Sequence, residues 1–210
     1  MRVLAWVAAG CLLAATSAQA TVVFNNGGPI NNGGNDATQW IQAEDFSFGA
    51  NQAVTGGGIY VDFQSTGATW DGTFDYFLFA DAGGTPGGTL ASGAAQNVVD
   101  SDSGILSYDG VRNIRLLTFD FLSTFNALAG TTYWFGIHLS SDYIRDDIAF
   151  ATTASGNGHE SNGGTLNNWF NNGQDHAFYL NGGAVPEPVS LALLGLGLLG
   201  MGGFRRKAAL

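Results

Sequence analysis

Hydrophobic and polar residues alternate with a period of two along most of the chain. In residues 59–63, Ile59, Val61 and Phe63 fall on one face and Tyr60 and Asp62 on the other. Because successive side chains of a β-strand point to opposite faces, this alternation is typical of a strand with one buried face. Further strands are expected at residues 21–24, 42–48, 70–80, 114–122, 131–139, 148–152 and 176–180.

Clusters of glycine, asparagine and aspartate separate these segments. They lie at residues 25–28, 31–34, 56–58, 83–88 and 171–173. Such residues favour turns, and no helical stripe of useful length occurs before Val189. Many short strands with a turn signal about every ten residues predict an all-β fold, an antiparallel β-sandwich or jelly roll.

The N-terminus has a different pattern. Met1 and Arg2 precede an apolar run at residues 3–15, and an A-x-A tripeptide then ends at Ala20. This order predicts a secretory signal peptide, cleaved by signal peptidase between Ala20 and Thr21. A retained anchor is the first alternative, but thirteen apolar residues are too short to cross a ~30 Å hydrocarbon core. A lipoprotein modified at Cys11 is the second, and its lipobox would be poor.

The C-terminus carries a second composite signal. It begins with Val185, Pro186, Glu187 and Pro188, continues with an apolar run at residues 189–204, and ends with the basic residues Arg205, Arg206 and Lys207. Sixteen helical residues span only ~24 Å, which suits a transient transmembrane helix with a cytoplasmic basic tail. An ordinary C-terminal anchor behind a proline linker is the alternative.

This C-terminal order resembles the PEP-CTERM sorting signal of Gram-negative bacteria that make exopolysaccharide. The resemblance implies processing by an exosortase, a membrane enzyme with a cysteine nucleophile, after transient insertion in the inner membrane. It also implies delivery to the cell surface, the outer membrane or the extracellular matrix. Residues 26–29, 39–46, 76–93 and 128–138 in addition resemble a domain that recurs ahead of such signals. That second resemblance implies a jelly-roll-like sandwich and no established activity.

The chain thus divides into a signal peptide at residues 1–20, an exported domain at 21–184 and a sorting signal at 185–210. The exported domain keeps sixteen carboxylates against three arginines, a net charge of about −13. This charge argues against nucleic acid as a partner, because binding to phosphates needs clustered Lys and Arg. Cys11, the one cysteine, leaves with the signal peptide, so we expect no disulfide in the exported domain.

Motifs that would indicate an enzyme are missing from the sequence. There is no G-x-S-x-G, P-loop or H-E-x-x-H, and three scattered histidines are more typical of surface positions than of a metal site. The stretch from Asp100 to Asp109 resembles a calcium loop but lacks its terminal glutamate, which favours a solvated turn. In the adjacent pair Glu44 and Asp45, one side chain should point inward and the other outward. We expect no catalytic residue, no cofactor and no metal.

Aromatic residues supply the candidate binding site. Trp134 and His138 flank Gly136 on the face opposite the apolar set, which would leave room for a flat ligand. Trp169 lies among asparagines, whose amides both donate and accept hydrogen bonds. An aromatic plane beside amides suits a neutral polysaccharide, so a carbohydrate-binding module associated with exopolysaccharide or biofilm is the first hypothesis. The alternative for the site is that Trp134 is buried and Trp169 closes the end of the sandwich.

Two other functions stay open at this stage. One is a purely structural or adhesive matrix protein without a specific glycan site. The other is a cryptic polysaccharide hydrolase, for which paired carboxylates would be needed.

The two terminal signals predict the mass of the exported protein. Intact-mass analysis of secreted material should give a chain that starts at Thr21 and has lost the tail with Arg205, Arg206 and Lys207. In a strain without the exosortase, the tail should stay attached and the protein should stay in the inner membrane. Equal masses and locations in the two strains, or a chain that starts at Met1 or Cys11, would contradict the assignment.

Overall fold

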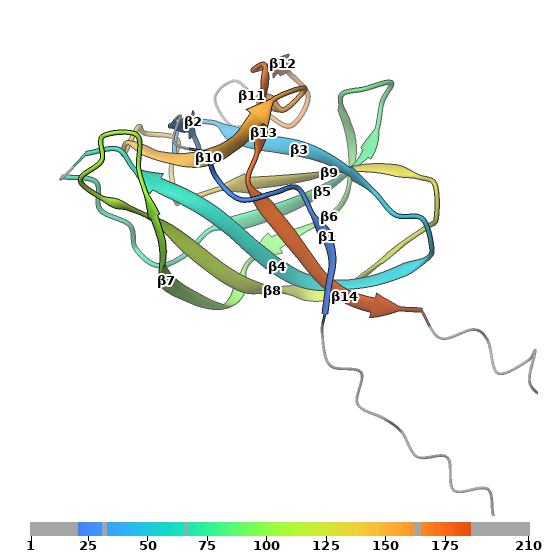
Figure 1. Cartoon of the computed structure of the whole chain (residues 1–210). Coiled ribbons are helices and arrows are strands. Elements are labelled where there is room, and N and C mark those ends of the chain that lie inside the picture. Colours follow the sequence, from blue (N-terminus) through green and yellow to red (C-terminus); the bar gives the residue numbers. More distant parts are fainter. Residues whose placement is uncertain (1–20, 31–32, 66, 162–164, 186–210) are drawn as a thin grey trace, which may run out of the picture.

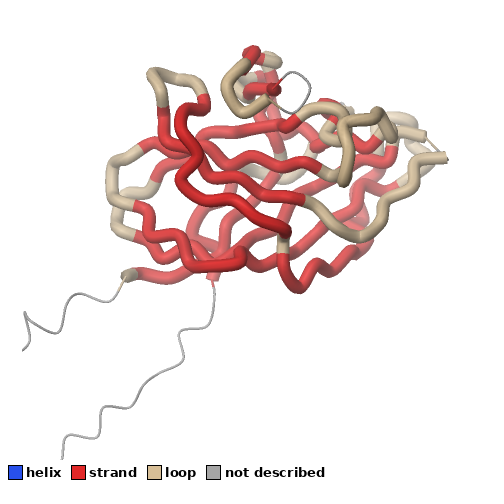
Figure 2. Tube along the Cα trace, turned by 180° about the vertical axis from the view of Figure 1, so that it is seen from behind, coloured by secondary structure: helices blue, strands red, loops and turns tan. Residues whose placement is uncertain are grey.

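A computed structural model describes residues 21–30, 33–65, 67–161 and 165–185 of the chain. The regular elements in these ranges are all β-strands, which confirms the all-β prediction (Figures 1 and 2). None of the described ranges contains a helix that is long and apolar enough to cross a membrane. The predicted signal peptide at residues 1–20 and the residues of the sorting signal from Pro186 onward, where a helix is predicted, lie outside the described residues.

The strands form two antiparallel sheets. The eight-stranded sheet contains β1 (Thr21–Asn25), β2 (Gly34–Asp36), β4 (Gln52–Phe63), β7 (Gln96–Leu106), β8 (Asn113–Ala127), β10 (Ile148–Ser155), β13 (Gln174–His176) and β14 (Phe178–Ala184). The six-stranded sheet has the order β12 (Trp169–Asn171), β11 (His159–Ser161), β3 (Ile41–Ser47), β9 (Thr132–His138), β5 (Asp75–Asp81) and β6 (Pro86–Ala94).

The long strand β4 lies at the centre of the eight-stranded sheet. On one side it pairs with β8, which in turn pairs with β7. On the other side it pairs first with β14 and then, from Val61 to Phe63, with β10. The chain crosses repeatedly between the two sheets, as expected for a sandwich with non-local pairing (Figure 1).

The main core lies between the sheets and is rich in phenylalanine. On β9 the inward residues Tyr133, Phe135 and Ile137 are buried, in the phase that the sequence predicted. Phe135 contacts Phe119 of the opposite sheet at 6.0 Å and Phe178 at 5.1 Å between ring centroids. Burial of these side chains from both sheets is the main stabilising contribution to the fold.

Two segments differ from the sequence prediction. Residues 70–73 form a turn rather than the start of a strand, because Asp71 accepts hydrogen bonds from both the backbone and the hydroxyl of Thr73. The solvated turn expected from Asp100 to Asp109 is wrong in its first part, since residues 100–106 belong to β7, whereas a turn does form around Asp109. Asp100 contacts Arg115 at 2.8 Å, and Asp102 accepts a hydrogen bond from Asn113 at 2.7 Å. These carboxylates therefore join the edge strand β7 to its neighbour β8.

The first and last described strands lie side by side. β1 begins at Thr21, the residue at which the mature chain is expected to start, and Thr21 is opposite Gly182 of β14. β14 ends at Ala184, next to Val185. The two ends of the described domain therefore leave it from the same side (Figure 1).

A glycine at the centre of β4 allows close approach of the neighbouring strands. A Cβ atom on Gly57 would overlap the carbonyl oxygen of Tyr179 in β14, which is backbone and cannot move aside freely. We therefore expect Gly57→Ala to lower the free energy of unfolding by about 1–3 kcal/mol. Thermal unfolding measures this effect, with Gly88→Ala as the control, because a Cβ atom there has open space around it. Equal melting temperatures for the two variants would contradict the close approach.

Candidate functional site

A second apolar cluster lies on the outer face of the six-stranded sheet. Ala43, Phe79 and Trp134 are fully buried there, and Phe77 and Trp169 pack against them while staying half-buried. Side chains alternate between the two faces of each strand. The residues adjacent in sequence to Ala43, Phe79 and Trp134 face the main core, so these three face outward. Hydrophobic residues that gather outside the main core of a sandwich mark a surface that needs a cover or a partner.

Residues 157–161 and 165–174, which we call the flap, cover part of this cluster. The flap contains β11 and β12, and β3 and β9 lie between it and β5 in the strand order. Trp169 nevertheless contacts Phe79 of β5 edge-on, at 5.2 Å and 74°. His159 contacts Trp134 of β9 at 4.8 Å and 82°. The flap therefore folds over the outer face of the sheet, at the top of Figure 1.

Trp134 does not present its indole to solvent, so the expectation of an open stacking surface at this residue is wrong. Its side chain is fully buried beneath the flap, and its Nε1 donates a hydrogen bond to Asp81 at 2.9 Å. The room expected above Gly136 is filled as well. A Cβ atom there would lie 2.9 Å from the ring of Phe79 and 3.4 Å from Ile41.

His138 is also buried and supports an exposed neighbour. Its Nε2 donates to the carbonyl oxygen of Thr38 at 2.7 Å, and burial lowers the pKa of its imidazole, which favours the neutral ring. The imidazole stacks on the ring of Tyr143 at 4.2 Å and 24°. Tyr143 itself is 42% exposed. His138 thus orients an aromatic ring at the surface instead of presenting its own.

Exposed polar groups surround the half-buried aromatic residues. Asn167 and Asn168 precede Trp169 and are exposed, as the sequence predicted for an amide-rich loop. Phe77 lies opposite the exposed Ser92 of β6 in the strand register. We call Phe77 and Trp169, with these polar neighbours, the aromatic patch.

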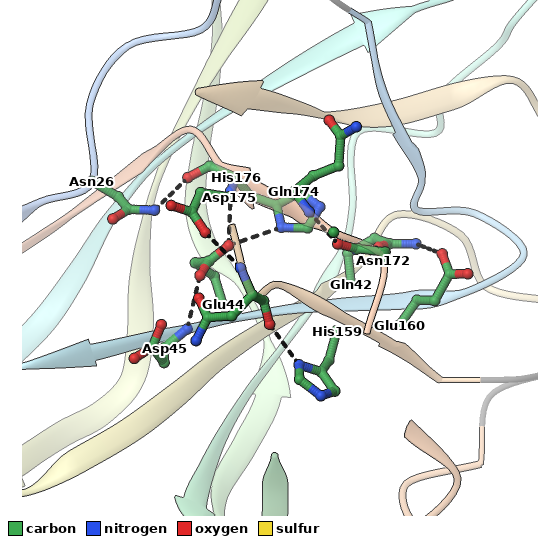
Figure 3. Close-up of polar contacts among 12 residues, drawn as sticks. Asn26, Gln42, Glu44, Asp45, His159, Glu160, Asn172, Gln174, Asp175 and His176 are labelled. Atoms are coloured by element: carbon green, nitrogen blue, oxygen red, sulfur yellow. Dashed lines mark hydrogen bonds and ion pairs between the residues drawn. The ribbon is translucent and has the colours of Figure 1, made fainter. Parts of the chain in front are cut away.

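The base of the flap is held by a buried polar contact (Figure 3). Glu44 of β3 accepts a hydrogen bond from the backbone N–H of His176 at 2.8 Å, and its Oε2 lies 3.2 Å from His176 Nδ1. The two side chains are 1% and 0% exposed. The imidazole also stacks on Phe150 at 4.6 Å. This contact joins β3 of one sheet to β13 of the other.

A second set of side chains ties the flap to β3. Buried Gln42 donates from its Nε2 to Glu160 at 3.3 Å and accepts from Asn172 at 3.0 Å. Both partners belong to the flap, so Gln42 and Glu44 anchor it at two points of one strand.

Burial moves the pKa values of Glu44 and His176 in opposite directions. Desolvation raises the pKa of Glu44 to about 9, although the backbone N–H of His176 opposes the shift. Desolvation lowers the pKa of His176 to about 3. The pair therefore holds one proton over a wide pH range, and the low-dielectric surroundings favour a protonated carboxyl beside a neutral imidazole.

The sequence indicated part of this arrangement. Of the adjacent acids, Glu44 points inward and Asp45 is partly exposed, as predicted. The expectation of surface histidines is wrong, because His138, His159 and His176 are all buried. Within the described residues, no group of three or more His, Cys, Asp or Glu side chains is arranged to hold a metal ion.

Comparison with known proteins identifies the C-terminal signal. Residues 184–207 match the model of the PEP-CTERM protein-sorting motif, which begins at the last residue of β14. The chain is accordingly an exported protein that an exosortase-type system sorts at the membrane. No curated protein matches the chain.

The shared proton of Glu44 and His176 predicts a pH dependence of stability. A carboxyl whose pKa rises from 4.5 to about 9 on folding stabilises the fold below pH 4.5, and this stabilisation is lost as the pH rises toward 9. The lowered pKa of His176 has the opposite effect on stability. It destabilises the fold, and only below pH 6.5. Between pH 6.5 and 9 the loss due to Glu44 should approach ~1.4 kcal/mol per pH unit.

Denaturant unfolding at pH 6.5, 7.5 and 8.5 measures this loss. Glu44→Gln should flatten the decline that the unchanged protein shows, because the amide does not titrate. Asp45→Asn, which removes an acid from the next position of β3, should keep the original slope. Parallel curves for the unchanged protein and the Glu44→Gln variant would disprove the raised pKa.

Proposed function

We propose that the exported domain is a carbohydrate-binding module that holds neutral exopolysaccharide at the cell surface or in the matrix. The sorting motif supports the location, because it places the chain among exported proteins that pass through membrane-associated sorting. The observation that carries the proposal is the aromatic patch on the outer face of the six-stranded sheet.

The aromatic patch has the properties that a sugar site requires. Phe77 and Trp169 are half-buried, so each keeps surface for contact while its orientation is set by packing. Phe77 and Phe79 stack at 5.8 Å with nearly parallel planes, and Trp169 closes on Phe79 from the side. Rigid rings lose little conformational entropy on binding, and neighbouring amides can bond sugar hydroxyls.

Charge narrows the class of glycan. Sixteen carboxylates against three arginines give the domain a strongly negative field, which repels uronate-rich or sulfated chains at low salt. A neutral polysaccharide avoids this repulsion. Weak contacts at single rings then gain strength through many copies on one matrix.

Binding without catalysis is part of the proposal. The acid and histidine that resemble a catalytic pair, Glu44 and His176, are closed off from solvent and bond each other between the sheets. Asp81, the acid beside the aromatic cluster, accepts hydrogen bonds from Trp134 and from the backbone of Gly83 and Gly84. These contacts serve folding and leave the aromatic surface as the functional feature.

Removal of the Trp169 ring tests the proposal. Trp169→Ala should weaken retention on the host's own neutral polysaccharide by roughly fivefold, which corresponds to about 1 kcal/mol for one aromatic contact. Phe170→Ala is the matched control, because Phe170 is next in β12, is 49% exposed and has no ring contact with Phe79 among the described pairs. Affinity electrophoresis measures retention, and thermal unfolding measures stability.

Three outcomes would count against this function. Equal retention of the two variants would remove Trp169 from the site. A loss of stability that matches the loss of retention would assign Trp169 to packing alone. No retention of the unchanged protein on any neutral glycan would favour a structural matrix protein.

A further inference from the structure

A pocket of about 290 Å³ opens between two loops, and none of the residues that line it belongs to the aromatic patch. One loop follows β4 and contains Trp70 and Asp71, and the other follows β9 and contains Ser140, Asp142 and Asp146. The volume lies near the lower end of the range of about 300–1,000 Å³ that small-molecule sites occupy. It suits one monosaccharide unit better than a longer ligand.

The indole of Trp70 forms a fixed wall of this pocket. Its Nε1 donates to the carbonyl oxygen of Thr73 at 2.6 Å, and the ring packs against the edge of the main core. The side chain remains half-buried, so part of the ring is open to the pocket. An anchored aromatic face of this kind can stack on a pyranose ring or attract a cation.

Three carboxylates line the pocket around this wall. Oδ1 of Asp142 accepts bonds from the hydroxyl of Ser140 and the backbone of Ile144, and Oδ1 of Asp71 accepts from Thr73. Their second oxygens and the carboxylate of Asp146 have no hydrogen-bond partner among the described residues. Each of the three acids therefore keeps at least one oxygen that can accept a hydrogen bond from a ligand.

The negative charge of the pocket is not compensated by a neighbouring base. Among the described residues that line it, none is Lys, Arg or His. Arg145 is adjacent in sequence, but its guanidinium contacts Asp147 at 2.7 Å and Asp36 at 3.7 Å. His138 is buried, and burial lowers the pKa of its imidazole, which disfavours a positive charge there.

We propose that this pocket binds a positively charged amino sugar, a hexosamine unit with a free amine. The ammonium group lies among Asp71, Asp142 and Asp146, and the sugar ring stacks on Trp70. Ser140 and Ser141 bond the ring hydroxyls. Carboxylates, an aromatic face and hydroxyls occur together here, and an ammonium-bearing sugar uses all three.

Other cations fit this chemistry less well. A metal ion needs several oxygens converging at about 2.0–2.6 Å, and no described group of acids is arranged to hold one. A lysine side chain would use the carboxylates but has no hydroxyl groups to bond Ser141 or the remaining acceptor capacity of Ser140, whose hydroxyl already bonds Asp142. The pocket is independent of the aromatic patch, so failure of either proposal leaves the other standing.

Titration of the exported protein with glucosamine tetramer tests the pocket. Isothermal calorimetry at pH 6 should show binding at least tenfold tighter than to the N-acetylglucosamine tetramer, which has the same ring but no charge. The difference should shrink as NaCl is raised, because screening weakens the charge contacts. No binding, or equal affinity for the two tetramers, would overturn the proposal, and so would equal binding of tetralysine.

Variants locate the binding at the pocket. The double change Asp142→Asn and Asp146→Asn should reduce glucosamine affinity at least tenfold, while the amides keep the loop contacts. Asp120→Asn is the control. It removes a carboxylate from β8, outside the pocket, and should leave the affinity for glucosamine unchanged. Trp70→Phe, which retains an aromatic ring for packing but loses the hydrogen bond to Thr73, should weaken binding several-fold, and its melting temperature measures the separate effect of that loss on the fold.

The aromatic patch provides the decisive comparison. Trp169→Ala should leave glucosamine binding intact. If Trp169→Ala abolishes it and the double Asp variant does not, the amino sugar binds at the patch and the assignment to the pocket is wrong.

Discussion

The buried contact between Glu44 and His176 is the constraint on which the outer face of the molecule depends. It joins the two sheets at the strand where the flap returns to the sandwich, and Gln42 adds a second attachment on the same strand. With its base held there, the flap covers Trp134 and brings Trp169 of β12 against Phe79 of β5, although three strands lie between β12 and β5 in the sheet order. Burying an acid and an imidazole is costly unless each has a partner. The shared proton pairs Glu44 Oε2 with His176 Nδ1 without leaving a net charge inside, although His176 Nε2 has no hydrogen-bond partner among the described residues.

This arrangement explains how an acidic, cysteine-free domain can maintain a defined surface outside the cell. No disulfide is available to staple the flap, because the one cysteine precedes residue 21. The flap strands β11 and β12 have three residues each, too few to hold the segment by pairing alone. Aromatic packing above the sheet and the polar anchors below it supply the missing constraint. The half-exposed rings are therefore a result of how the flap is held, and they remain available for contact.

The sequence predicted the fold class and most of the long strands, because a period of two is a local property that one buried face imposes. It did not predict β7, where exposed side chains such as Val99 and Asp100 belong to an edge strand with little burial to pattern it. Trp134 was assigned correctly to the face opposite the apolar set. Its burial depends on a flap more than twenty residues away, and alternation carries no information about such a cover. The burial of His176 could not be predicted for the same reason, because its partner Glu44 is 132 positions away along the chain.

The positions of the chain ends relate the candidate sites to the sorting signal. β1 begins and β14 ends at the bottom of the molecule in Figure 1, whereas the flap lies at the top. The sorting motif begins at residue 184, the last of β14, so no linker separates the domain from the signal that directs it to the membrane. The chain therefore enters the sorting motif at the end of the domain that lies opposite the flap. Because the flap is held through β3 and β13 and not through β14, the contacts that shape the aromatic patch do not involve the strand that leads into the sorting motif.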